Sequence, residues 1–283
     1  MPHRSAPPPI ITLTTDFGLH DSYVGVMKGV ILSICPHAQI IDLTHSIAPQ
    51  QIYAAARVLT QAVPYFPPTT IHLVVVDPEV GLPTRRPIAL ETPLGRFVGP
   101  DNGLFGPVWQ QSQAAGVGRA VYLNQPAFWL PRLSATFHGR DLFAPVAAHL
   151  ANGVDLAVLG AALAAPHPLD LPTPTCTATA ITGTIIAVDH FGNCISNITA
   201  SMLDQLGARD TLRVTLGDTG LSLPITHTYA DVPSGCAVAL IGSDDALEVA
   251  IRAGNASHTY QIGVGTPVVV QAPYTTEATP AAE

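Results

Sequence analysis

The chain has 283 residues, of which 47% are hydrophobic and only 11% are charged, and its formal net charge at pH 7 is −8. This length favours two domains, and the acidic balance argues against a nucleic-acid partner, since contact with a phosphate backbone needs a basic face. No window approaches the roughly 18 to 20 consecutive apolar residues of a membrane span, and Met1 to Pro9 lack the apolar stretch of a signal peptide. We therefore expect a soluble, cytoplasmic protein with no membrane partner.

Apolar strand-like runs alternate with runs of helical spacing in the first half of the chain. The predicted strands are Ile10–Thr14, Ile40–Leu43 and Thr70–Val76, and the predicted helices are Tyr23–Ile34, Gln50–Ala62 and Ala144–Asn152. The unbroken β-branched run Thr70–Val76 is typical of a strand buried on both faces. This alternation predicts an α/β domain over residues 8–165, with a mostly parallel sheet and helices on both sides.

A proline-rich stretch with no sustained period follows over Ala161–Pro174, and from it we place a semi-rigid linker at residues 166–177. Beyond it, short strand-like runs are separated by glycine, asparagine and aspartate. These runs are Gly183–Val188, Leu212–Leu216, Ala237–Ile241 and Thr266–Gln271. They predict a smaller C-terminal β-barrel domain over residues 178–273.

Four polar motifs end apolar runs, and each places a charged or hydrogen-bonding side chain beside glycine. They are TTDFG at 14–18, VVDPEVG at 75–81, TFHGRD at 136–141 and DHFGN at 189–193. In α/β proteins ligands collect at the carboxyl ends of the strands, where such residues are delivered. The motifs therefore predict an enzyme.

Asp16 follows the first strand, where a carboxylate can accept two hydrogen bonds from a ribose diol, as the acidic residue of dinucleotide-binding folds does. A turn or helix-capping aspartate is the alternative. Asp77, Arg85 and His138 form a second candidate group, in which a base or polariser, an orienting carboxylate and a fixed cation would converge. An ion pair at a strand end, with a separate structural histidine, would produce the same pattern.

The second half of the chain carries further candidates. Asp189, Phe191 and Asn193 combine an aromatic face with amide and carboxylate groups, which suits a purine, although a β-turn has the same composition. Ser243 and the Gly254–Ala256 turn could offer hydroxyl and backbone donors to a carboxylate or an adenine edge. Between them Leu247, Val249 and Ile251 alternate as the core face of a strand would.

Several of these motifs together resemble one family, over about residues 9–271 and in one order. The segments that carry the resemblance are TDFGLHDSYVGVMKGV, VVVDPEVG followed by RR, VGPDNGLF, TFHGRDLFAPVAA, DHFGNCISNI and LEVAIRAGNAS. They are similar to the S-adenosyl-L-methionine (SAM) hydroxide adenosyltransferases, the SAM hydrolases related to fluorinase and chlorinase. The resemblance implies an N-terminal α/β domain, a C-terminal β-barrel and a homotrimer with active sites between subunits.

The activity implied by the resemblance is cleavage of SAM to adenosine and methionine, with water or hydroxide attacking the ribose C5′. The implied catalytic residues are Asp77, Arg85 and His138, and the adjacent Arg86 leaves the choice of arginine open. Implied substrate-binding residues are Asp16 at the ribose, Asp189, Asn193 and Ser243 at the methionine portion, Phe191, Asn255 and Ala256 at the adenine, and Phe137.

No cofactor is expected, because SAM is the substrate and its sulfonium already leaves as a neutral thioether. The four cysteines are far apart, and neither a zinc site nor another metal site is signalled. Two alternatives remain open. One is a SAM-dependent halogenase, although Asp77 stands where those enzymes carry a tyrosine. The other is a non-catalytic SAM- or adenosine-binding protein, or a trimer with vestigial sites.

Overall fold

The computed structural model describes residues 7–114, 116–170 and 172–272. The chain divides into two compact units, Met1–Asp170 (the N-terminal unit) and Leu171–Glu283 (the C-terminal unit). Leu171, inside the predicted linker, and residue 273, at the end of the predicted barrel domain, lie outside the described residues.

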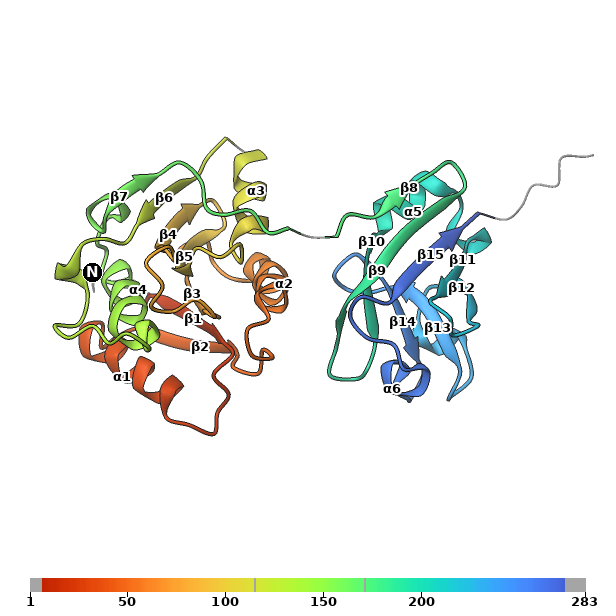
Figure 1. Cartoon of the computed structure of the whole chain (residues 1–283), viewed down its shortest axis with the longest axis horizontal. Helices are drawn as coiled ribbons and strands as arrows, with labels where there is room; N and C mark the ends of the chain where they lie inside the picture. The colour runs from red at the N-terminus through yellow and green to blue at the C-terminus, as the bar shows by residue number, and fades with distance from the viewer. Residues whose placement is uncertain (1–6, 115, 171, 273–283) are drawn as a thin grey trace, which may run out of the picture. The chain divides into compact units, whose positions relative to one another are not determined.

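The N-terminal unit is built on a mixed sheet of seven strands in the order β2-β1-β3-β5-β4-β6-β7 (Figure 1). The strands are β1 (Ile10–Thr15), β2 (Gln39–Thr44), β3 (Ile71–Val75), β4 (Pro87–Thr92), β5 (Gly95–Pro100), β6 (Arg119–Tyr122) and β7 (Ala161–Leu163). Pairing is parallel from β2 through β1 and β3 to β5, and antiparallel from β5 onward. The predicted α/β class is confirmed, and its parallel part is the half of the sheet that carries the motifs.

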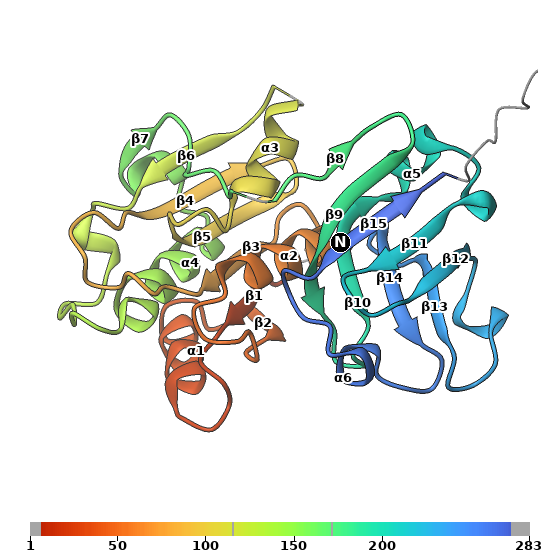
Figure 2. The same cartoon turned by 45° about the vertical axis from the view of Figure 1, so that its right-hand side comes forward.

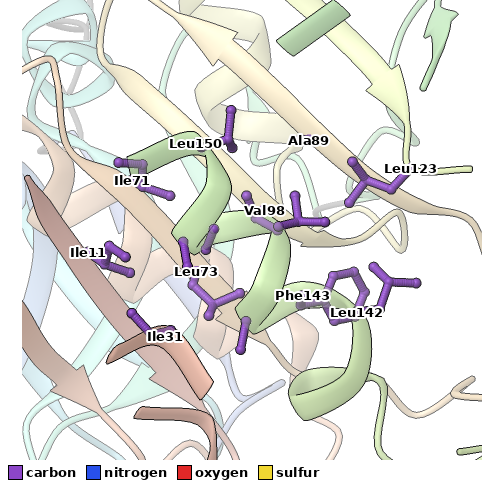
Figure 3. Close-up of a cluster of buried hydrophobic side chains, with 14 of the residues drawn as sticks. Ile11, Ile31, Ile71, Leu73, Ala89, Val98, Leu123, Leu142, Phe143 and Leu150 are labelled. Atoms are coloured by element: carbon purple, nitrogen blue, oxygen red, sulfur yellow. The ribbon is translucent and has the colours of Figure 1, made fainter. Parts of the chain in front are cut away.

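Helices cover both faces of this sheet. On one face α1 (Tyr23–Ile34) and α4 (Ala144–Ala151) pack on β1 and β3, where Leu73 and Phe143 are fully buried (Figure 3). On the other face α2 (Ile52–Ala62) and α3 (Gly106–Ala114) pack on Val74 and Phe97. All of β3 is buried, as its β-branched run predicts. In the described part of the chain, no helix is long and apolar enough to cross a membrane.

The C-terminal unit is a β-barrel (Figure 2). Its strands are β9 (Ala180–Val188), β10 (Cys194–Thr199), β11 (Arg213–Leu216), β12 (Ser222–Thr226), β13 (Ala237–Ile241), β14 (Ala246–Ile251) and β15 (Pro267–Gln271), with β8 (Thr175–Cys176) added beside β9. The pairing of β10 with β9 closes the barrel. Leu247, Val249 and Ile251 point into its core, as their alternation predicts. Two short helices, α5 (Ala200–Leu206) and α6 (Ala256–Tyr260), follow β10 and β14.

Strands occupy both ends of the proline-rich region, because β7 extends the N-terminal sheet and β8 belongs to the barrel. Between them, His167 is held by Asp101, whose Oδ1 accepts the backbone N–H of His167 at 2.7 Å. Gly103 packs so closely on Pro168 that a Cβ there would lie 2.9 Å from the proline carbonyl oxygen. The first part of this region is therefore anchored on the N-terminal unit.

His72 is the buried titratable residue of β3. Its Nδ1 is 2.8 Å from the Thr12 hydroxyl, and its ring stacks on Phe97 with centroids 5.1 Å apart. Burial lowers its pKa from 6.5 to about 4. The fold therefore holds this imidazole neutral.

We predict that His72 makes stability depend on pH. Its folded-state pKa is below its unfolded value, so its stabilising effect is complete above pH 6.5 and is lost as the pH falls toward 4. These values correspond to a loss of about 2 kcal/mol between pH 7.5 and pH 5. Chemical denaturation at the two pH values measures the free energy of unfolding. Between pH 7.5 and pH 5, His72→Gln should lose less of this free energy than the unaltered protein does, by that amount. The exposed His20, changed to Gln, is the matched control, and an equal loss in both variants would contradict the prediction.

Candidate active site

The polar residues of the N-terminal unit meet at the carboxyl ends of β1 and β3. These strands are parallel neighbours with Thr15 opposite Val75. Asp16 follows β1 directly, and Asp77 comes two residues after β3. The two carboxylates are close enough that the charge of Asp16 raises the pKa of Asp77. The strand-end prediction therefore holds for both residues.

Three successive turns fold the chain back from Asp77 to Arg85. Backbone N–H groups donate from Val80 to the carbonyl of Asp77 (3.3 Å), from Leu82 to that of Glu79 (3.0 Å) and from Arg85 to that of Leu82 (3.2 Å). Gly81 lies within these turns at φ 86°, and a Cβ there would be 2.7 Å from the carbonyl oxygen of Ala135. A glycine is needed at this position for both reasons.

Arg85 joins Asp77 to His138. Its Nη2 lies 3.3 Å from Asp77 Oδ2 and donates a hydrogen bond to His138 Nδ1. The side chains of Arg85 and Asp77 are 1% and 5% exposed, and the guanidinium lies 5.3 Å from the centroid of the Phe143 ring. Because arginine only donates, Nδ1 must carry no proton, so His138 is neutral with its proton on Nε2.

The loop that carries His138 is held by a buried aspartate. Asp141 accepts the backbone N–H of Ser134 at 2.7 Å and pairs with Arg140. The Ser134 hydroxyl accepts the backbone N–H of Phe137 at 3.0 Å. His138 then precedes a π-helix, Gly139–Phe143, that runs into α4. Such π-helical turns occur frequently at functional sites.

The pKa values of Asp77 and His138 are both shifted from their ordinary values. Burial raises the pKa of Asp77 to about 6, with Arg85 opposing the shift and Glu79 and Asp16 adding to it. Burial, and then the charge of Arg85, lowers the pKa of His138. Within the described residues, neither carboxylate oxygen of Asp77 accepts a well-aligned hydrogen bond, although both are buried. A buried carboxylate whose pKa is raised to about 6 is suited to take up a proton from a reactant.

An aromatic cluster borders the Asp16 loop. Phe17, Tyr23 and Phe137 have ring centroids 5.1 to 5.9 Å apart, so the predicted Phe137 lies beside the first motif. Phe17 and Tyr23 were not among the predicted site residues, although the position of Phe17 next to Asp16 is the signal that could have identified it. Asp16 Oδ2 accepts the backbone N–H of Gln50 at 2.9 Å.

Arg86 belongs to a different contact from Arg85. It pairs with Asp101, whose side chain is fully buried. The structure therefore brings Arg85, and not Arg86, to Asp77 and His138. Among the described residues, no three His, Cys, Asp or Glu side chains are grouped as metal ligands would be.

In the C-terminal unit, Asp189 organises its own turn. Its Oδ1 accepts the backbone N–H groups of Phe191 and Asn193, and its Oδ2 accepts Asn193 Nδ2, each at 2.9 Å. The turn leaves the Phe191 side chain 71% exposed, whereas Asn193 is buried. The predicted β-turn is thus present, and it presents an aromatic ring.

Asn255 and Ala256, two further candidates, lie beside this turn. The backbone N–H of Ser257 donates to the Gly192 carbonyl at 3.0 Å, which joins the Asp189 turn to Asn255 and the buried Ala256. Asn255 Oδ1 caps α6 at 2.7 Å from the His258 N–H. Ser243 lies in the turn between β13 and β14.

The sequence matches one protein family in both units. Residues 11–160 match the SAM hydroxide adenosyltransferase N-terminal domain, and residues 183–269 match the C-terminal domain of the same family. The chain belongs to the SAM hydroxide adenosyltransferase family.

Several proteins of known name or structure are similar to this chain over most of its length. An (R)-S-adenosyl-L-methionine hydrolase of Salinispora arenicola is 39% identical over 93% of this chain and 98% of its own length. Another, from Thermus thermophilus, is 36% identical over 90% and 96%. A fluorinase of Nocardia brasiliensis is more distant, at 29% identity over 93% and 97%. An uncharacterized conserved protein from Thermotoga maritima has a similar crystal structure, with a TM-score of 0.84 and 35% identity over 92% and 99%.

We predict that Arg85→Gln raises the pKa values of both His138 and Asp77. The cation repels the protonated imidazole and attracts the carboxylate, so its loss moves both pKa values upward. NMR titration of the labelled side chains measures this directly. Arg86→Gln is the matched control and should leave the pKa of His138 unchanged. An unmoved His138 pKa in Arg85→Gln would contradict the geometry of the cluster.

Proposed function

We propose that this member of the SAM hydroxide adenosyltransferase family hydrolyses S-adenosyl-L-methionine to adenosine and L-methionine. The observation that carries the proposal is the buried cluster of Asp77, Arg85 and His138 at the strand ends. Relatives named as hydrolases of this substrate align along more than nine-tenths of their own length, which supports it.

The proposed reaction is a nucleophilic substitution at the ribose C5′. The water oxygen forms the new bond to C5′ while the C5′–S bond breaks, and its electron pair stays on sulfur as the neutral thioether of methionine. Since the leaving group needs no proton, catalysis consists of placing water in line with the C5′–S bond and removing its proton. We propose no metal ion or cofactor for these steps.

The proton of water is assigned to Asp77 in this proposal. His138 Nδ1 already accepts from Arg85, so the neutral ring presents Nε2–H, a donor that can orient the water oxygen. The carboxylate oxygens of Asp77 are buried acceptors, and a pKa of about 6 leaves the group ionised at pH 7. Arg85 would stabilise the hydroxide character that develops on the water.

Substrate binding is proposed to involve both units. Asp16 would accept the ribose hydroxyls, next to Phe137. The Asp189 turn with Asn193, together with Ser243, would hold the methionine portion, and Phe191, Asn255 and Ala256 would bound the adenine. We also propose a homotrimer with sites between subunits and a cytoplasmic location. Burial of apolar surface between subunits would account for a chain that is 47% hydrophobic.

A halide nucleophile suits this cluster poorly. An ionised Asp77 would repel chloride or fluoride at the position where the nucleophile must sit. The relatives named as fluorinases are also more distant than those named as hydrolases, at 29% against 39% identity. We therefore propose water as the nucleophile.

We predict that the purified protein converts SAM to adenosine and methionine in the presence of EDTA, and that added chloride or fluoride gives no 5′-halo-adenosine. Asp77→Ala and His138→Ala should each lower kcat by about a hundredfold or more, the usual contribution of a positioned proton-transfer group, while SAM binding survives. Liquid chromatography with mass spectrometry measures the products, and calorimetry measures binding.

Results other than those predicted would each support a different interpretation of the protein. Unchanged turnover in both variants would contradict the proposed catalytic group. A halogenated nucleoside would identify a halogenase. SAM bound tightly but left intact by the unaltered protein would identify a binding protein, and no binding would leave only a structural role.

A further inference from the structure

Thr15 and His45 form a buried polar pair behind the Asp16 loop. Thr15 ends β1 with its side chain fully buried, and His45 follows β2. The Thr15 hydroxyl lies 2.8 Å from His45 Nδ1 and also accepts the backbone N–H of Phe17 at 3.2 Å. One hydroxyl therefore joins the end of β1, the Asp16 turn and the segment after β2.

Asp42 and Lys28 connect this pair to the protein surface through charged contacts. His45 Nε2 lies 3.0 Å from Asp42 Oδ1, and Lys28 Nζ on α1 donates to Asp42 Oδ2 at 2.6 Å. A carboxylate beside Nε2 favours the tautomer with its proton on that nitrogen. His45 Nδ1 is then an acceptor, and the Thr15 hydroxyl donates to it.

The same segment holds Asp16 by its backbone. Gly18 N–H donates to the His45 carbonyl at 2.8 Å, and Gln50 N–H donates to Asp16 Oδ2 at 2.9 Å. Gln50 adopts φ 68°, a left-handed conformation that costs about 1 kcal/mol or more for a residue with a side chain. The segment from His45 to Gln50 thus contacts the Asp16 turn at three points.

We propose that the Thr15–His45 pair, supported by Asp42 and Lys28, is a positioning device that presents the Asp16 carboxylate to the two hydroxyls of a ribose. The inference rests on the proposed function for the ribose role of Asp16. Asp16 itself is the binding residue, and Thr15 and His45 act through it. A bidentate contact with a diol depends on the orientation of the carboxylate, which a hydrogen-bonded turn restricts.

The alternative is that Thr15 and His45 only fill the core, and two variants of Thr15 separate the possibilities. Thr15→Val keeps the shape of the side chain and deletes the hydroxyl, whereas Thr15→Ser keeps the hydroxyl and deletes a methyl group. Two variants of His45 give a second, independent pair. His45→Asn keeps an acceptor at the position of Nδ1, whereas His45→Gln places its amide at the position of Nε2.

The test is calorimetric binding of adenosine and of 2′,3′-dideoxyadenosine, which lacks both hydroxyls, to the full-length variants. Thr15→Val should weaken adenosine binding by about tenfold, the loss expected for one hydrogen bond, and leave dideoxyadenosine binding unchanged. Thr15→Ser should bind both ligands as the unaltered protein does. His45→Gln should weaken adenosine binding as Thr15→Val does, and His45→Asn should weaken it less. In Asp16→Ala the effect of Thr15→Val should disappear.

An equal loss for both ligands, or a Thr15→Ser variant as impaired as Thr15→Val, would overturn the inference in favour of core packing. Unaltered protein that binds the two nucleosides equally would also overturn it, because Asp16 would then have no ribose role. SAM cleavage is measured in parallel. If SAM is cleaved but loss of the Thr15 hydroxyl does not selectively weaken adenosine binding, only the positioning device is rejected. If loss of the Thr15 hydroxyl does weaken adenosine binding but SAM is not cleaved, only the hydrolase function is rejected.

Discussion

One buried cation organises the candidate active site. Arg85 is enclosed in the N-terminal unit, and a guanidinium in such a place requires compensation by a carboxylate and by acceptors. Asp77 supplies the charge, His138 supplies Nδ1, and the Phe143 ring covers the remaining face. The turns at Gly81 and the Asp141-held loop bring these groups to the guanidinium. Burial lowers the pKa of His138 and raises that of Asp77 to about 6; the charge of Arg85 adds to the first shift and opposes the second.

The carboxyl ends of β1, β2 and β3 provide the frame around this cation. Asp16 and Asp77 follow adjacent parallel strands, and His45 follows the third. Each contributes a polar group at one edge of the sheet, where backbone groups are no longer engaged in the ladder. Burial is the main cause of the raised pKa of Asp77, and the negative charges of Glu79 and Asp16 add to it. In the proposed reaction these negative charges would favour the sulfonium cation of the substrate.

Much of this arrangement could be predicted from the sequence, because strand-end motifs and β-branched runs encode the parallel half of the sheet. The choice between Arg85 and Arg86 could not be predicted. Adjacent side chains on an extended segment point to opposite sides, and the spacing in the sequence does not say which of the two faces Asp77. The strands β4, β5 and β6 were also not predicted, because prolines and glycines bound them as in loops.

The most direct test of the central claim, that this cluster delivers water to C5′, is cleavage of SAM in ¹⁸O-labelled water followed by mass spectrometry of the products. The account predicts adenosine with one labelled oxygen at its 5′ position and unlabelled methionine. Label in methionine, or adenosine with unlabelled 5′ oxygen, would contradict attack by water at C5′ and remove the proposed roles of Asp77 and His138.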